Sequence, residues 1–297
     1  MIVAGVGQPV RLAGFGLLRG LGPWRWRIGV RQQRLRRTEA LVLREMNYGE
    51  ADRILTLLTP GGKVRAIAYG IRRSTSRKVG HLGLFCRAQV MLARGRGLDT
   101  VTQAEGLEEH EGIRNDLLRF GYACYVGELA DRFAQEQEES SVLFELVVRT
   151  LRQLGESQRL RIWVRYFEVR LLSLSGYQPE LFSCINCRAT IRPEINFFSL
   201  DQGGLLCNRC GQVQQFGQDQ PRARAVAINA QKVLRYMQTH GRDEVSRLRI
   251  GEVTHRELES LLHSYLEHTL ESELRSVGFL HRLRRELHEA ERVAGGM

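Results

Sequence analysis

Four of the six cysteines of this 297-residue chain fall into two CxxC pairs within the stretch "CINCRATIRPEINFFSLDQGGLLCNRCG". Cys184 and Cys187 form the first pair, and Cys207 and Cys210 form the second pair nineteen residues further on. Each CxxC turn directs two thiolates at one point, and four soft thiolates in a tetrahedral array suit Zn²⁺. The pattern predicts one zinc ion held by these four side chains, so the segment must fold back on itself as a compact module.

Four protein ligands leave such an ion without an open coordination position, so the site is predicted to be structural and not catalytic. Metal-linked folding at a site of this kind contributes about 10 kcal/mol or more. A redox dithiol pair and an iron–sulfur centre are alternatives, although thioredoxin-like and ferredoxin-like flanks are missing. Contact of the module with nucleic acid is a third interpretation, since its loop contains Arg188, Arg192 and Arg209. Glu194 and Asp201 in the same loop favour a solvated surface.

Short β-like runs follow one another from Thr38 to Gly106 without an intervening helical pattern. Strands are predicted over residues 39–46, 52–59, 63–70, 85–94 and 98–106, and the turn at Pro60, Gly61 and Gly62 joins the second and third as a hairpin. Five short strands within about 70 residues predict a small barrel. An OB-type barrel fits best, and an SH3-like barrel is the alternative.

After Glu109 the apolar residues recur at the spacing of one helical face. Helices are predicted over residues 113–135, 140–154, 160–176, 223–241 and 254–276. Thr254 is the predicted N-cap of the last helix, with Glu257 completing a capping box. His263 and His268 are predicted to lie on the surface of that helix. The predicted fold class is therefore α+β and multidomain: an amino-terminal five-stranded OB-type barrel, then a helical domain with an inserted four-cysteine zinc module.

The predicted domains follow from these elements. They are an extension at 1–30, the barrel at 31–110, the first part of the helical domain at 111–180, the zinc module at 181–215 and the second helical part at 216–297. The extension lacks a continuous apolar segment followed by a small-residue cleavage site, so it does not read as a secretory signal. Val30 is an alternative native start. Cys86 and Cys124 are predicted to be buried thiols, and this cysteine usage predicts a reducing, cytoplasmic location.

The net charge of +11 is unevenly spread along the chain. The first 107 residues hold 19 Lys and Arg residues against six Asp and Glu residues, a net charge of +13, which leaves −2 for the rest. A strongly basic module on a near-neutral body predicts a polyanionic partner, and nucleic acid is favoured over lipid because no basic amphipathic helix occurs there. A solvated basic surface is the alternative. No run of 18 apolar residues occurs, so no membrane association is predicted.

The stretch "YGIRRSTSRKVGH" is the strongest candidate for contacts with a nucleic-acid backbone. Four basic residues lie within seven positions in it, namely Arg72, Arg73, Arg77 and Lys78. If four phosphates of a single strand are neutralised, the slope of log affinity against log salt concentration is roughly −3. Tyr48, Tyr69 and Phe85 are the main candidates for base stacking, and Phe85 is predicted to be core instead. So few aromatic residues indicate binding dominated by charge. A second basic cluster consists of Arg31, Arg34, Arg36 and Arg37.

Sequence signatures of enzymes are scarce, and no catalytic residue is predicted. Gly61, Gly62 and Lys63 lack the upstream glycine of a phosphate-binding loop, and no HExxH, GxSxG or GxGxxG motif stands in the required context.

Several stretches together resemble the bacterial recombination mediator and DNA repair family RecO. They are "TEALVLREMNYGEADRILTLLTPGGKVRAIAYGIRRSTSRKVGHLGLF", "RGRGLDTVTQAE", "LLSLSGYQPELFSCINC" and "FFSLDQGGLLCNRC". The resemblance covers most of the chain from about Thr38 and implies an OB fold, a helical domain and a zinc module. The stretch before Arg31 lies outside the family pattern.

The resemblance also implies a function. The family binds single- and double-stranded DNA, anneals complementary strands, works with RecR, contacts the single-stranded-DNA-binding protein and helps to load RecA. Carried over by position, it adds Lys63 and Arg65 to the candidate DNA contacts, supplies no catalytic residue, and implies action at the nucleoid in the cytoplasm. A zinc-containing RNA-binding or transcription-associated factor is the competing hypothesis.

Overall fold

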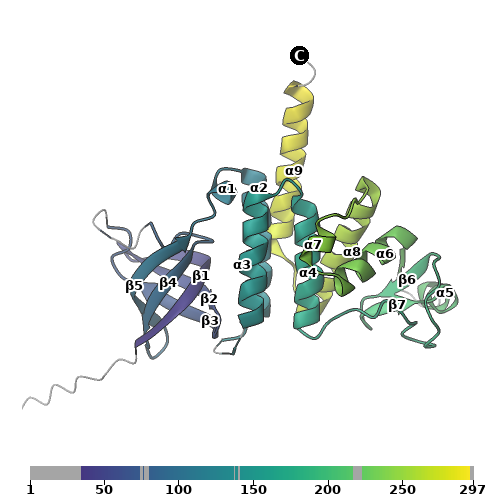
Figure 1. Ribbon diagram of the computed structural model, residues 1–297, viewed down its shortest axis with the longest axis horizontal. Coiled ribbons are helices and arrows are strands. Elements are labelled where there is room, and N and C mark those ends of the chain that lie inside the picture. The colour runs from purple at the N-terminus through teal and green to yellow at the C-terminus, as the bar shows by residue number, and fades with distance from the viewer. Residues whose placement is uncertain are drawn as a thin grey trace, which may run out of the picture. The chain divides into compact units, whose positions relative to one another are not determined.

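The computed structural model describes residues 35–73, 76, 80–136, 138–139, 141–216 and 223–294. Its amino-terminal part is a closed barrel of five strands (Figure 1). They are β1 (Leu35–Tyr48), β2 (Asp52–Thr59), β3 (Gly62–Ala68), β4 (Arg87–Ala93) and β5 (Asp99–Glu108). The five predicted strands are thereby confirmed. β1 extends beyond its predicted range at both ends because it pairs with β4 along its first half and with β2 along its second half.

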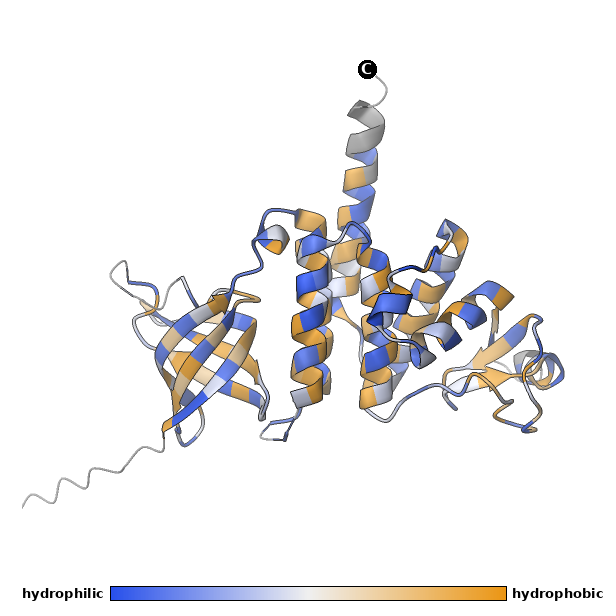
Figure 2. Cartoon of the chain, viewed as in Figure 1, coloured by the Kyte–Doolittle hydropathy of each residue, from blue (hydrophilic) through white to orange (hydrophobic). Residues whose placement is uncertain are grey.

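The strand order β1-β2-β3-β5-β4 closes through pairing of β4 with β1. All neighbours are antiparallel except β3 and β5, which run parallel where Ala66 lies opposite Asp99. This is the OB-type barrel that the sequence predicted. Alternate residues point inward, as Figure 2 shows in the alternation of polar and apolar colours along the strands. Leu55, Leu57 and Ala66 are among the side chains that fill the interior.

The outer face of the barrel packs on the helical domain through a second core. Leu41, Leu43 and Leu58 belong to a cluster of buried residues that continues through the helices and not to the cluster inside the barrel. Phe85 belongs to this cluster, is 3% exposed and meets Phe120 edge to face with ring centroids 5.9 Å apart. The prediction that Phe85 is a core residue is confirmed, and the outer face of the barrel shares one apolar core with the helices, distinct from the cluster inside the barrel.

The first part of the helical domain contains three helices of 15 to 17 residues, which Figure 1 shows beside one another. They are α2 (Leu117–Phe133), α3 (Ser141–Glu156) and α4 (Leu160–Leu174), preceded by the short α1 (Glu111–Arg114). Asp116 caps α2, since its carboxylate accepts the backbone N–H groups of Leu118 and Arg119. The later helices are α6 (Ile228–Thr239), α7 (Arg242–Val245), α8 (Glu252–Leu270) and α9 (Arg275–Ala294).

A small antiparallel sheet interrupts these helices. It consists of β6 (Asn196–Ser199) between β7 (Gly204–Leu206) and β8 (Ala223–Val226), and α5 (Asn208–Phe216) packs beside it. Two predictions are wrong here. Residues 223–226 form β8 and not the first turn of a helix, because they pair with β6. Thr254 is not an N-cap, because α8 begins at Glu252, and Glu257 instead accepts the backbone N–H of Ala227 at 2.6 Å.

The other predictions about organisation stand as follows. Residues 1–30 lie outside the described residues. The domain boundaries stay predictions, with β5 ending at Glu108 and α1 beginning at Glu111. Within the described part of the chain, no helix has the length and apolar character needed to span a membrane.

Candidate metal centre and nucleic-acid interface

The four cysteines of the two CxxC pairs converge on one point. Their Sγ atoms all lie within 4.8 Å of one another, and none of the four forms a disulfide. The Sγ atoms of Cys187 and Cys207 are 3.8 Å apart. A Zn²⁺ ion at 2.3 Å from each of four tetrahedral sulfurs would separate them by about 3.8 Å, whereas a disulfide needs about 2.05 Å. The residues present therefore fit a four-thiolate metal ion.

Backbone contacts bring the two cysteine pairs together. The N–H of Ile185 donates to the carbonyl of Leu205 at 3.0 Å, and the N–H of Cys207 points at Cys184 Sγ at 3.3 Å. Cys184 has no exposed surface, while Cys187 is exposed and the second pair is partly buried. At Gly211 a Cβ would lie 2.1 Å from the Phe197 ring, so only glycine allows α5 to sit this close to β6. The cluster can hold a metal ion, and all four positions are protein ligands.

A second group of potential ligands, Glu259, His263 and His281, lies between α8 and α9. Arg284 already neutralises Glu259, with Nη1 2.5 Å from Oε1. Arg161 Nη2 lies 3.9 Å from the other carboxylate oxygen. Two guanidinium groups beside the only carboxylate of this group make it a poor cation site.

The prediction that His263 is a surface residue is wrong. It is 8% exposed, and its ring lies against Tyr125 with centroids 5.2 Å apart. Burial and the positive charge of Arg165 lower the pKa of His263 to about 3. Beside it, Glu168 is fully buried, accepts the Tyr125 hydroxyl at 2.5 Å and has a pKa raised by burial to about 7. This polar cluster sits in the core of the helical domain, which single-sequence spacing does not reveal.

The basic loop after β3 is anchored to the barrel where it begins. The N–H of Arg72 donates to the carbonyl of Ala51 at 2.9 Å, and the N–H of Gly70 donates to Asp52 Oδ1 at 2.7 Å. The Arg72 and Arg73 side chains are exposed. Arg77 and Lys78 lie outside the described residues, as does Arg34.

A second basic group surrounds the opposite end of the barrel, where β1 begins and β4 ends. Arg36, Arg65 and Arg94 line a hollow of about 320 Å³ there. Sequence reasoning missed Arg94, and only strand pairing brings it beside Arg36. Lys63 lines the hollow too, but its ammonium is engaged by α2: Nζ lies 2.6 Å from the carbonyl oxygen and 3.3 Å from the carboxylate of Asp131.

The barrel carries a set of cations without anionic partners. Among the described residues, seven exposed barrel arginines make no ion pair within 4.0 Å, whereas Arg44, Arg53, Lys63 and Arg87 do. The seven are Arg36, Arg37, Arg65, Arg72, Arg73, Arg94 and Arg96. Fixed unpaired cations on one small module create the positive potential that attracts polyanions.

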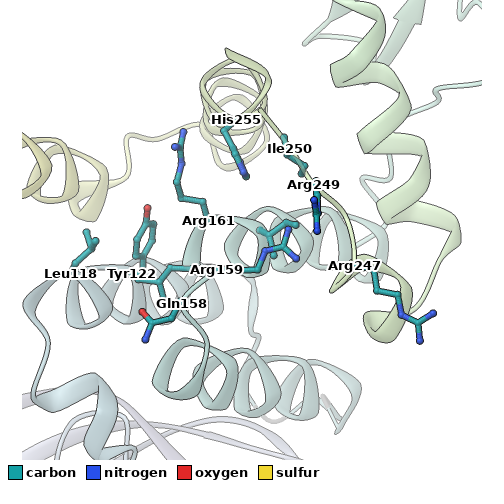
Figure 3. Close-up of a pocket in the computed structure, with 11 residues that line it drawn as sticks. Leu118, Tyr122, Gln158, Arg159, Arg161, Arg247, Arg249, Ile250 and His255 are labelled. Atoms are coloured by element: carbon teal, nitrogen blue, oxygen red, sulfur yellow. The ribbon is translucent and has the colours of Figure 1, made fainter. Parts of the chain in front are cut away.

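The helical domain has its own arginine-lined pocket, of about 830 Å³, beside the amino-terminus of α4. Figure 3 shows Arg159, Arg161 and Arg249 around it, with Arg247 turned away. Leu118, Tyr122 and Ile250 supply apolar lining. Burial, and next the charge of Arg161, lower the pKa of His255 in this pocket to about 4, so that residue is neutral at pH 7. Arg161 is already paired with Glu252 at 2.6 Å, and Arg159 donates to the backbone carbonyls of Ser246 and Leu248, so part of the pocket's positive charge is engaged within the protein.

The fold and the site define a DNA repair protein built from an OB-type barrel and a helical domain, because two family models match these two parts. Residues 34–110 match the model described as "Recombination protein O N terminal". Residues 114–277 match the one described as "Recombination protein O C terminal". The chain belongs to the RecO family.

Curated relatives agree with this assignment. A DNA repair protein RecO of Roseiflexus sp. (strain RS-1) is 39% identical over 265 residues, covering 89% of this chain and 92% of its own length. One from Dehalococcoides mccartyi is 36% identical and covers 84% and 96%. One from Desulforudis audaxviator is 40% identical and covers 83% and 96%. The resemblance found in the sequence is thereby confirmed.

Proposed function

We propose that this protein is a non-enzymatic recombination mediator that binds single- and double-stranded DNA and anneals complementary strands. The observation that carries the proposal is the set of seven exposed barrel arginines without an ion pair among the described residues. The membership of this chain in a DNA repair family supports the choice of DNA as the polyanion.

The mechanism follows from where the charge lies. Arginine side chains on the barrel neutralise phosphates of one strand and reduce its repulsion of a second strand. Contacts to phosphates carry no sequence information and leave the base edges free to pair. Arg72 and Arg73 of the basic loop are the main contacts, together with Arg36, Arg37, Arg65 and Arg94; Arg34, Arg77 and Lys78 belong to the same proposed set. Lys63 is the weakest member because Asp131 already binds its ammonium.

The four-cysteine cluster holds one Zn²⁺ in this proposal, because four soft thiolates favour zinc among the common divalent ions. The 3.8 Å sulfur separation supports it. A bound ion would link the two halves of residues 181–216, and Cys184, Cys187, Cys207 and Cys210 would be its ligands. Its role is structural, and none of the annealing chemistry passes through it.

Protein partners complete the proposed function. With RecR the chain would promote loading of RecA on strands covered by the single-stranded-DNA-binding protein, at the nucleoid in the cytoplasm. The arginine-lined pocket beside α4 suits an acidic partner segment with an apolar side chain. The charge reversal Arg249→Glu should abolish capture of such a partner and leave DNA affinity unchanged. Capture at wild-type strength would exclude the pocket as the contact.

Salt dependence of DNA affinity tests the proposed interface. Each single-strand phosphate contact contributes about −0.7 to the slope of log affinity against log salt. The variant Arg72→Ala/Arg73→Ala should therefore bind an oligonucleotide more weakly and with a slope shallower by about 1.4. An unchanged slope would contradict the assignment of these two residues.

The matched control variant is Arg192→Ala/Arg209→Ala, which removes two exposed arginines from the zinc module. The mediator proposal expects wild-type affinity and slope from it. A shallower slope in this control, with no change in the barrel variant, would instead support the competing hypothesis of a zinc-containing nucleic-acid-binding factor.

A further inference from the structure

Three of the large side chains exposed on the described barrel lie near the ends of β1 and β3, while Leu35 at the start of β1 and Leu107 near the end of β5 are exposed as well. Met46 is 56% exposed, Tyr48 is 53% exposed and Tyr69 is 57% exposed. Phe85, by contrast, lies in the core between barrel and helices. Large apolar side chains gathered on one strand face indicate a binding surface more often than singly scattered ones do.

Strand register places the two tyrosines at one end of the barrel. Tyr48 at the end of β1 lies opposite Asp52 of β2, and Tyr69 directly follows Ala68, the last residue of β3, which lies opposite Arg53 of β2. Neighbouring strands of a sheet are about 4.8 Å apart. Tyr48 and Tyr69 thus lie at the same end of the barrel on either side of β2, carried by β1 and by the turn after β3, two strands that are about 10 Å apart.

Contacts at this end of the barrel hold the backbone beside both tyrosines in place. Asp52 Oδ1 accepts the N–H of Gly70, the residue after Tyr69, at 2.7 Å. The carbonyl of Ala51, in the turn after Tyr48, accepts the N–H of Arg72 at 2.9 Å. Both tyrosines therefore sit at the base of the basic loop, on backbone fixed by hydrogen bonds.

Charge on the flanks indicates what would cover these rings. Arg72 and Arg73 follow Tyr69 in the chain, and the exposed Arg65 lies four residues before it on β3, toward the hollow that it lines with Arg36 and Arg94. A docking protein would need acidic groups around an apolar patch, whereas a nucleic-acid strand carries phosphates and flat bases together. Stacked bases in one strand rise about 3.4 Å, so tyrosines carried by backbone segments about 10 Å apart fit separate, unstacked bases.

We infer that Tyr48 and Tyr69 form a base-stacking site for unpaired bases of a DNA strand whose phosphates lie along Arg65, Arg72 and Arg73. The inference rests on the proposed function and adds strand discrimination to it. A duplex offers phosphates to the arginines but keeps its bases stacked inside, so the rings contribute only to single-strand affinity. Stacking uses the face of a base and leaves its pairing edge open, which is compatible with annealing.

The test compares Tyr48→Ala/Tyr69→Ala with Tyr48→Phe/Tyr69→Phe on a single-stranded oligonucleotide and on a duplex, each over a range of salt. Loss of one stacked base weakens binding about 5- to 150-fold. The alanine variant should lose at least about 20-fold on the single strand at an unchanged salt slope, and nothing on the duplex. The phenylalanine variant should bind both ligands like the parent, because its rings remain.

Wild-type single-strand affinity in the alanine variant, or an equal loss on both ligands, would overturn the inference. Loss of a protein partner with unchanged DNA affinity would overturn it too, and would identify the patch as a protein contact. Arg72→Ala/Arg73→Ala, measured alongside, separates the two levels. If the arginine variant shows a shallower salt slope and the tyrosine alanine variant binds like the parent, base stacking is excluded and the proposed function stands. If the tyrosine alanine variant loses single-strand affinity and the arginine variant keeps its slope, the stacking site stands and the proposed arginine contacts are excluded.

Discussion

The buried histidine of the helical domain predicts a specific loss of stability in mild acid. His263 has an ordinary pKa of 6.5 when the chain is unfolded and a pKa of about 3 when it is folded, because burial and Arg165 disfavour its charged form. Between these values the unfolded chain binds one more proton than the folded chain, so stability is present above pH 6.5 and is lost as pH falls toward 3. At pH 5 the loss is about 2 kcal/mol.

Replacing the titrating group isolates this contribution. The free energy of unfolding would be measured by urea denaturation at pH 7.5 and pH 5.0 for the parent and for His263→Gln, which cannot titrate in this range. The decrease on acidification should be about 2 kcal/mol smaller in the variant. Contributions from groups far from His263, including the metal site, are present in both proteins and cancel in the difference, whereas Glu168 lies 3.8 Å from the His263 ring and contributes to the difference.

The control is His268→Gln, since the His268 side chain is 45% exposed. It should show the same decrease on acidification as the parent. If His263→Gln and His268→Gln behaved alike, the histidine would not be buried as described, and the assignment of the polar cluster to the core would fail.

Two further predictions concern the zinc module and the joint between barrel and helices. Cys207→Ser should lose the bound metal and speed amide hydrogen exchange across residues 181–216, where Phe197 and Leu205 belong to the main core. Hydrogen exchange in the barrel strands and DNA affinity should stay unchanged. Loss of the metal with unaltered hydrogen exchange would contradict a structural role. Gly62→Ala places a Cβ 2.4 Å from the carbonyl oxygen of Glu138 at a φ of 102°, so it should cost about 1–3 kcal/mol of stability. Gly97→Ala, with open space around it, should cost almost nothing, and equal melting temperatures for the two glycine variants would refute the close contact.

Local patterns were sufficient to predict the five barrel strands and the helices α2, α3, α4 and α6, whereas the helix predicted over 254–276 ends at Leu270 and α9 begins at Arg275. The alternation in "DRILTLLT" fixes which residues enter the barrel, and the turn at Gly61 and Gly62 fixes the register of β2 against β3. The CxxC spacing was enough to predict that four thiols meet, because each pair carries its own turn. Both are short-range properties of the chain.

Long-range pairing accounts for what could not be predicted. Residues 223–226 form β8 because they pair with β6. Glu257 is not part of a capping box because α8 begins at Glu252, and its carboxylate instead accepts the backbone N–H of Ala227. His263 is buried because α2 brings Tyr125 against it. The pairing of Lys63 with Asp131 and the placement of Tyr48 and Tyr69 at one end of the barrel likewise depend on contacts between separate elements.

Annealing of complementary strands already covered by the single-stranded-DNA-binding protein tests the central claim most directly. The wild-type chain should accelerate annealing, with and without added RecR, and Arg72→Ala/Arg73→Ala should slow it while retaining the metal ion and the melting temperature of the parent. Arg192→Ala/Arg209→Ala should anneal at the wild-type rate. Annealing at the wild-type rate by the barrel variant would contradict a mediator that works through the basic surface of its barrel.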